Sequence, residues 1–152
     1  MKTDKQIIIN NRKAFRDYAI LETLECGIEL KGSEVKSLRE AKASLDDSFA
    51  KIENEEVFLY NMHINPYLAA SYQNVDPLRV RKLLLKKGQI NKFASKTKEK
   101  GLTLIPLKLY FNKKGFAKIE LALGRGKKFF DKREDIKKRE FNLKVKRILK
   151  NR

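Results

Sequence analysis

The sequence feature that most constrains the fold is a pair of alternating patterns on either side of a tight turn. Over 103–111, every second residue from Thr103 onward reads Thr, Ile, Leu, Leu, Phe. Over 117–123, every second residue from Ala117 onward reads Ala, Ile, Leu, Leu. A period of two is that of a β-strand, whose successive side chains point to opposite faces. The segment NKKG at 112–115 is typical of a hairpin turn. The pattern therefore predicts an antiparallel hairpin with Lys118 on its outer face.

Other segments with strand character suggest that this hairpin belongs to a larger sheet. Residues 18–30 are apolar and β-branched, and Gly27 predicts a bend or bulge there. Residues 48–53 and 57–62 flank Asn54-Glu55-Glu56 and predict a second hairpin. About six strands joined by turns indicate a small, closed or nearly closed antiparallel barrel.

Short helices are expected between the strands. Ser33 is a plausible N-cap for a helix over 32–39. A turn of helix is predicted near 80–85, and a longer helix over 88–100 that ends at Gly101. We expect a flexible lead over residues 1–10 and a long loop over 63–78, where two prolines interrupt any periodicity.

The net charge of +17 is concentrated in two stretches. Residues 79–100 hold nine basic residues and one acidic residue, and residues 125–152 hold thirteen and four. Residues 1–78, by contrast, hold ten basic and thirteen acidic residues. Such segregation indicates an anionic partner, and nucleic acid is favoured over a membrane because neither basic stretch has a broad apolar face.

The basic tail over 125–152 differs in kind from the barrel. Three acid-before-base pairs at i,i+4 and a stripe formed by Phe141, Val145, Ile148 and Leu149 allow a helix. Because positive charges repel one another and the stripe is narrow, we expect a tail that is disordered or loosely helical when free and helical along a polyanion. The alternative is a terminal helix docked on the barrel through that stripe.

The sequence lacks a catalytic or metal-binding constellation. His63 is the single histidine and Cys26 the single cysteine, too few for a structural zinc site, and neither has an evident catalytic partner. Asp46 and Asp47 alone are too few carboxylates for a metal-dependent nuclease. We therefore expect a protein that is not an enzyme and needs no cofactor. A lone cysteine and no secretory segment favour the cytoplasm.

Five short strings, in order along the chain, match motifs of a known family. They are NRKA (11–14) with DY (17–18), GSEVKSLR (32–39), DP (76–77) with RKLLL (81–85), PLKLY (106–110), and GKK (126–128) with DKR (131–133). On these strings the chain resembles the SsrA-binding protein (SmpB) family. Each string alone is weak, but five at these spacings are specific.

The resemblance implies a mainly β fold: a six-stranded antiparallel barrel of the oligonucleotide-binding (OB) type over 11–124, flanking helices and a separable tail. It also implies a partner, the tRNA-like domain of transfer-messenger RNA (tmRNA). With elongation factor Tu, the family delivers this charged RNA to stalled bacterial ribosomes in trans-translation. The tail is expected to contact the decoding centre and enter the empty mRNA channel. No membrane role is implied, and a monomer is expected.

The resemblance also assigns site residues. The RNA-binding residues are Glu25, Leu84 and Lys118, with support from Lys13, Arg16, Lys36, Arg81 and Lys82. The ribosome-contacting residues are Gly126, as a flexible joint, with Lys127, Lys128, Asp131, Lys132, Arg133, Ile148 and Leu149. Two positions depart from the family pattern, because Arg16 stands where many members have His and Phe130 where some have it. Both replacements can still stack on bases.

Two other classes of RNA-binding protein share the basic charge and the barrel. One is a small ribosomal protein, and the other is a general single-strand RNA-binding protein of the OB type. A general binder should display a row of exposed aromatic side chains, for which Phe116 and Tyr110 are the candidates.

Overall fold

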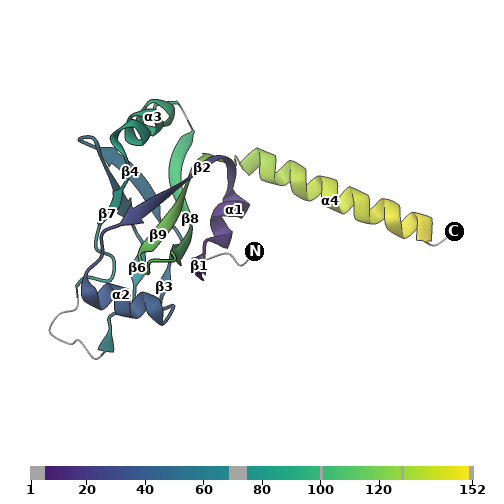
Figure 1. The fold of residues 1–152 in the computed structure, drawn as a ribbon. Helices are drawn as coiled ribbons and strands as arrows, with labels where there is room; N and C mark the ends of the chain where they lie inside the picture. Colours follow the sequence, from purple (N-terminus) through teal and green to yellow (C-terminus); the bar gives the residue numbers. More distant parts are fainter. Residues whose placement is uncertain (1–5, 69–74, 100, 128, 151–152) are drawn as a thin grey trace.

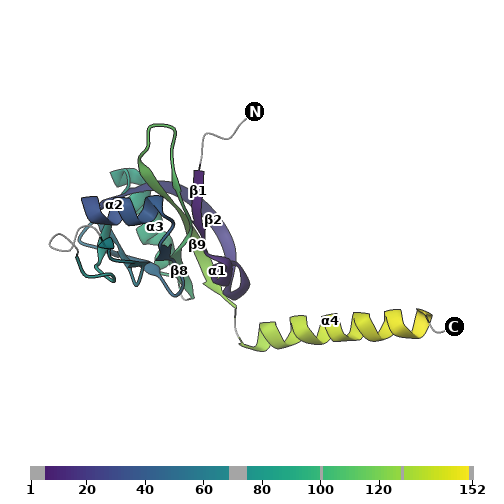
Figure 2. The ribbon, with the colours of Figure 1, turned by 90° about the horizontal axis from the view of Figure 1, so that it is seen from below.

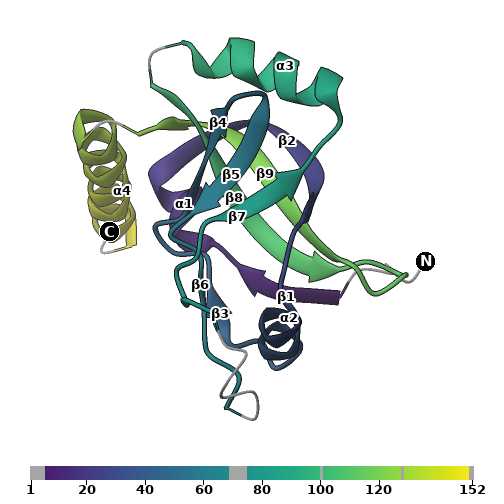
Figure 3. The ribbon, with the colours of Figure 1, turned by 90° about the vertical axis from the view of Figure 1, so that its left-hand side faces the viewer.

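Six antiparallel strands close into a barrel in a computed structural model of the chain, which describes residues 6–68, 75–99, 101–127 and 129–150. Each strand pairs with the next around the ring, and pairing of the last strand with the first closes it (Figure 3). The predicted mainly β barrel with flanking helices is therefore confirmed. In ring order the strands are β8 (Leu102–Phe111), β4 (Phe49–Glu53), β5 (Glu56–Tyr60), β7 (Arg81–Leu84), β2 (Tyr18–Ile28) and β9 (Ala117–Gly126).

The helices lie around the outside of this barrel. Helix α3 (Lys87–Thr97) covers one end, α2 (Gly32–Arg39) lies at the other, and α1 (Arg12–Asp17) packs beside β2 and β8 (Figure 1). Two short strands, β3 (Ala43–Ser44) and β6 (His63–Ile64), pair with each other near α2. The segment 63–78, expected to be a loop, therefore begins with a strand.

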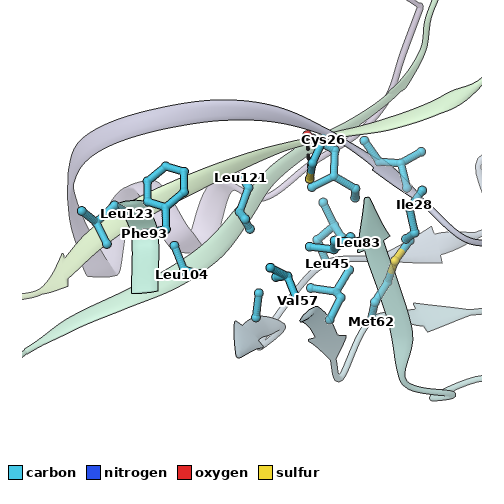
Figure 4. Close-up of a cluster of buried hydrophobic side chains, with 14 of the residues drawn as sticks. Cys26, Ile28, Leu45, Val57, Met62, Leu83, Phe93, Leu104, Leu121 and Leu123 are labelled. Carbon is cyan, nitrogen blue, oxygen red and sulfur yellow. Dashed lines mark hydrogen bonds between the residues drawn. The ribbon is translucent and has the colours of Figure 1, made fainter. Parts of the chain in front are cut away.

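The core fills the barrel and extends under the helices. Side chains such as Leu59, Leu83, Leu109 and Ile119 are almost fully buried, and Figure 4 shows part of this cluster around Leu83 and Leu121. A second, smaller cluster joins α1 to the other face of the β8–β9 hairpin; it comprises Ala14, Ile105, Leu107 and Ala122.

A bulge in β8 divides these two clusters. The pairing of β8 with β9 shifts register between Pro106 and Lys108. A bulge adds one residue and so reverses which side chains face inward. As a result, Leu104 and Leu109 both belong to the barrel core although they are an odd number of positions (five) apart, whereas Ile105 and Leu107 face α1. The prediction that every second residue over 103–111 shares one face is wrong on this point.

The N-terminal segment and residues 80–85 are also strands. Residues Gln6–Asn10 form β1, which pairs with β8, so the expected flexible lead is wrong over these residues. Strand β7 replaces the predicted turn of helix and joins β5 to β2. Its pattern was obscured because Arg81, a charged residue, occupies an inward position beside buried Leu83.

Three predicted turn or cap positions are wrong in detail. Helix α2 is capped at Lys31, not Ser33, and its Glu34 side chain accepts a hydrogen bond from the Lys31 amide. Helix α3 ends at Thr97, and Gly101, at φ +88°, belongs to the turn that precedes β8. The irregularity in β2 lies between Ile20 and Glu22 instead of at Gly27.

The barrel extends further toward the tail than expected. Residues 124–126, where the barrel was expected to end and the tail to begin, are the end of β9, and Gly126 pairs with Tyr18. A Cβ atom on Gly124 would lie 2.8 Å from Cδ1 of Ile105, so glycine here permits close packing. Gly126 is therefore held in the sheet, and the connection to the tail begins at Lys127, whose amide donates to the Asp17 carbonyl at 2.9 Å.

The tail is a single helix, α4 (Phe129–Lys150), that projects away from the barrel (Figures 1 and 2). We expected this segment to be disordered or loosely helical when free and helical along a polyanion, and that change on binding stays a prediction. Residues 139–150 are exposed, including Phe141, Ile148 and Leu149. This exposure contradicts the alternative in which the apolar stripe docks on the barrel. Within the described ranges, no helix combines the length and apolar character needed to cross a bilayer.

Candidate nucleic-acid interface

A straight row of four residues crosses the outer face of the barrel. Tyr110 of β8 lies opposite Lys118 of β9, Lys118 opposite Gly27 of β2, and Gly27 opposite Leu84 of β7. Neighbouring residues in these strands, namely Leu109, Ile119, Cys26 and Leu83, point into the core. The alternation therefore places the row on the outside, as predicted for Lys118.

Three residues of this row, Gly27, Leu84 and Lys118, line a groove of about 710 Å³. It brings together four of the residues predicted to bind RNA, which come from β2, β7 and β9: Glu25, Lys82, Leu84 and Lys118. The Leu84 side chain is 49% exposed there. The start of α3 and the β4–β5 turn complete the walls; the residues that they add include Lys86, Lys87, Asn54, Glu55 and Glu56. We call this the β2–β7–β9 groove.

Glu25 is held in place at the edge of this groove. The hydroxyl of Tyr110 donates a hydrogen bond to Oε2 of Glu25. Tyr110 is only 3% exposed, and burial together with this carboxylate raises the pKa of its hydroxyl, which therefore stays a donor. A carboxylate oriented in this way can accept further hydrogen bonds from base N–H groups or 2′-hydroxyls. Such hydrogen bonds make an acidic residue compatible with a candidate RNA interface.

Most of the basic segment 79–100 is neutralised within the protein. Six of its nine basic side chains form ion pairs with glutamates from residues 1–78. The pairs are Arg79 and Arg81 with Glu34, Lys82 with Glu56, Lys87 with Glu55, and Lys92 and Lys96 with Glu22. Among the described residues that line the groove, Lys86 and Lys118 are the lysines with no carboxylate within 4.0 Å. These two carry the groove's uncompensated positive charge.

Arg81, which the resemblance assigns to the RNA interface, lies inside the protein and does not line the groove. Its side chain is fully buried, with Nη2 2.5 Å from Oε2 of Glu34 and Nη1 donating to the Met62 carbonyl at 2.6 Å. Arg79 donates to the other oxygen of Glu34 at 2.6 Å. We call Glu34, Arg79 and Arg81 the buried ion cluster. It joins α2 to β7, which is a structural role.

Opposing effects set the pKa of Glu34 in this cluster. Burial alone would raise the pKa of the Glu34 carboxyl, but hydrogen bonds from Arg79 and the Lys31 amide, together with the charge of Arg81, outweigh it and lower that pKa. Burial lowers the pKa of Arg81 despite its pairing with Glu34. An arginine nevertheless stays protonated in proteins. The pair is thus ionised at neutral pH.

The remaining residues predicted to bind RNA lie outside the groove. Lys13 and Arg16 are on α1; Lys13 pairs with Asp47 at 2.6 Å, and Arg16 with Asp17 at 3.3 Å. Lys36 is on α2, with its ammonium 5.6 Å from the centre of the Tyr67 ring. The sequence patterns missed two residues that line the groove, Gly27 and Lys86, and they missed the role of Tyr110, which orients Glu25. The string PLKLY contains Tyr110, but no local signal links it to Glu25, 85 positions earlier.

The tail residues named from the resemblance lie along one projecting element. Lys127 follows β9, while Lys128 lies outside the described residues. Asp131, Lys132 and Arg133 are near the start of α4, and Ile148 and Leu149 are exposed near its end. The tail thus extends away from the groove-bearing body as a separate surface (Figure 2).

Cys26 borders the groove but is buried and unreactive. Its thiol donates to the Ile119 carbonyl at 3.5 Å, and burial raises its pKa to about 12. The thiolate, which is the nucleophilic form, is therefore scarce at neutral pH. Cys26 acts as a small apolar filler in the core (Figure 4).

Comparison with known proteins places the chain in a family. The family model described as SmpB protein matches residues 8–151. The SsrA-binding protein of Caldicellulosiruptor saccharolyticus is 56% identical over 147 residues, which are 97% of this chain and 92% of that protein. The SsrA-binding protein of Thermosipho melanesiensis is 56% identical over 145 residues, 95% of this chain and 99% of that protein.

A solved structure agrees with these sequence matches. One chain of the structure described as "tmRNA-SmpB: a journey to the center of the bacterial ribosome" is 55% identical to this protein, with a TM-score of 0.68. The match covers 80% of this chain and 85% of that one. Together with the barrel and the matched length, these likenesses show that the chain belongs to the SmpB family of SsrA-binding proteins.

Proposed function

We propose that this protein binds the tRNA-like domain of tmRNA through the β2–β7–β9 groove and helps to deliver it to stalled bacterial ribosomes in trans-translation. The observation that carries the proposal is the groove itself. It gathers Glu25, Leu84 and Lys118 from three strands, together with Lys82 and Lys86. An apolar side chain, an oriented carboxylate and uncompensated lysines are suited to an RNA loop with an unstacked base.

The projecting tail supports a second contact, with the ribosome. Helix α4 projects from the barrel, and its residues 139–150, which include several lysines and arginines, are exposed. A basic helix of this kind can follow the phosphates of ribosomal RNA. We propose that it enters the empty mRNA channel and contacts the decoding centre, while elongation factor Tu contacts the charged RNA. The protein would act in the cytoplasm as a monomer and would itself carry out no chemistry.

A general single-strand RNA-binding function has less support. Of the two aromatic side chains considered for a stacking row, Phe116 is 63% exposed, whereas Tyr110 is buried against Glu25. One exposed ring does not form a stacking platform. RNA recovered with the protein from a bacterial lysate distinguishes the functions: the proposal requires enrichment of tmRNA, whereas a general or ribosomal binder would enrich other RNAs alone.

Replacement of Lys118 tests the groove directly. Lys118→Ala is expected to weaken binding of the isolated tRNA-like RNA about tenfold at low salt, because an uncompensated cation is lost. The slope of log affinity against log salt concentration should fall by about 1, as for loss of one phosphate contact. Filter binding over a series of salt concentrations measures both quantities.

Lys114→Ala is the matched control for this experiment. Lys114 is exposed in the turn of the same β8–β9 hairpin, away from the groove. Its replacement removes the same charge but should leave affinity and salt slope close to those of the unmodified protein. If both variants lost the same affinity, the RNA would be held by the overall charge of the protein and not by the groove.

The tail peptide provides a separate prediction. Because residues 139–150 have exposed side chains, packing contributes little to this part of α4, and an isolated helix of this length is marginal in water. A peptide of residues 127–152 should therefore show partial helicity by circular dichroism, rising when RNA is added. Equal helicity with and without RNA would contradict a role for polyanions in ordering the tail.

A further inference from the structure

Gly27 lies at the centre of the row across the groove, and neither a positive φ nor a bulge requires a glycine at this position. A glycine inside a strand weakens it and often marks one of these two features or a close approach of other atoms. Gly27 is not among the glycines with positive φ, and the register of β2 is regular there. It pairs with Lys118 on one side and with Leu84 on the other. Of the remaining reasons, a close approach is the one that the neighbours of Gly27 support.

The close neighbour is Leu84. A Cβ atom built on Gly27 would lie 3.3 Å from Cβ, 3.4 Å from Cδ1 and 3.7 Å from Cγ of Leu84, and all three of its nearest atoms belong to that side chain. The Leu84 side chain thus packs close to the backbone of Gly27, which has no Cβ atom, while Leu84 remains 49% exposed. A Cβ atom at position 27 would require Leu84 to shift by a few tenths of an ångström and so would disturb the way that it lies against the sheet.

We infer that Gly27 is a positioning residue for RNA: by letting Leu84 lie flat, it creates an apolar ledge on which one unstacked nucleobase rests. This inference depends on the proposed function and adds the chemistry of the bound group. Lys118, next to Gly27 in the row, is placed for the phosphate of that nucleotide. Glu25, oriented by Tyr110, is placed for an N–H group on the edge of the base. The ligand is therefore a nucleotide extruded from an RNA loop.

The test is Gly27→Ala in the full-length protein, with Gly88→Ala as matched control. Gly88 is also a glycine without positive φ, but a Cβ atom there would have no neighbour within 4 Å. Gly27→Ala should weaken binding of the tRNA-like RNA about fivefold, because a base contact is impaired. Its salt slope should stay unchanged, since no cation is lost, in contrast to Lys118→Ala. Gly88→Ala should bind like the unmodified protein.

Thermal unfolding separates this role from a structural one. Alanine is more favourable than glycine inside a strand, so Gly27→Ala should unfold at the same temperature as the unmodified protein or higher. Binding would then fall while stability does not. A fall in both, with binding recovered when the temperature is lowered, would mean that Gly27 serves only folding and would overturn the inference.

Two further measurements locate the base. The first measurement uses RNAs that each carry a single abasic site in an unpaired loop. At one of these sites, loss of the base should lower the affinity of the unmodified protein about fivefold and should not lower the affinity of Gly27→Ala any further. In a Leu84→Ala background, Gly27→Ala should change affinity less than about twofold. Equal binding by Gly27→Ala and the unmodified protein would overturn the inference but leave the proposed function standing. Failure of the unmodified protein to bind the RNA would overturn the proposed function.

Discussion

Replacing Arg81 by methionine should lower the free energy of unfolding by about 3–5 kcal/mol, the range observed when one partner of a buried ion pair is removed. Methionine fills much of the arginine's volume, so the loss comes chiefly from charge. Glu34, which is 3% exposed, would keep its negative charge with only Arg79 beside it. The Met62 carbonyl would also lose its donor. Urea unfolding followed by circular dichroism measures the change.

An exposed ion pair is the control for this result. Lys42 lies 3.3 Å from Glu40, and both side chains are about half exposed, at 51% and 47%. Lys42→Ala should change stability by less than about 1 kcal/mol, as is usual for surface pairs. Adding Glu34→Leu to Arg81→Met should restore part of the stability, because the unpaired buried charge is then gone. An Arg81→Met variant as stable as the unmodified protein would show that Glu34 does not depend on Arg81.

Removal of residues 127–152 should stop peptide tagging on stalled ribosomes while leaving binding of the isolated tRNA-like RNA largely intact. The separation is expected because the groove residues lie in the barrel, whereas α4 projects from it. Tagging should fall to background, a decrease of at least about 100-fold, since an aligned helix contributes through many phosphate contacts at once. Reconstituted translation of an mRNA without a stop codon measures tagging, and filter binding measures affinity.

A tail of the same composition in scrambled order is the control for charge. It keeps the twelve basic and four acidic residues of 127–152 but removes the stripe that contains Ile148 and Leu149. We expect it to bind the isolated RNA as well as the full-length protein does and to tag poorly. If truncation abolished RNA binding, the division of roles between groove and tail would be wrong.

The strands that could be predicted from the sequence are those with apolar residues at every inward position. The hairpins of β4 with β5 and of β8 with β9 meet this condition. Strand β7 does not meet it, because one of its inward-facing residues is the charged Arg81. Glu34 neutralises Arg81 but lies 47 positions away in the sequence, so the pairing can be recognised only in the folded structure. The bulge in β8 was missed for a related reason, since Leu107 is as apolar as the residues beside it and α1 accepts it on the other face.

The candidate site could be predicted only in part. Motifs identified Glu25, Leu84 and Lys118, and the structure brings these three together in one groove. The roles of Gly27 and Tyr110 were missed because they arise from the register of four strands. Ion pairs within the protein leave only part of the positive charge of segment 79–100 for an RNA partner. The acidic excess of residues 1–78 supplies its counter-ions, which segment totals cannot reveal.

The link between barrel and tail has a consequence for the order of binding events. Gly126 is paired in the sheet and α4 begins at Phe129, so only two residues separate the two bodies. With 22 residues at 1.5 Å each, α4 spans roughly 33 Å. Once the barrel is anchored, the far end of the helix is confined to a small volume, which corresponds to an effective concentration in the millimolar range. A weak intrinsic affinity of the tail is then sufficient for it to occupy its proposed site on the ribosome. When the barrel dissociates, the tail can still leave that site rapidly.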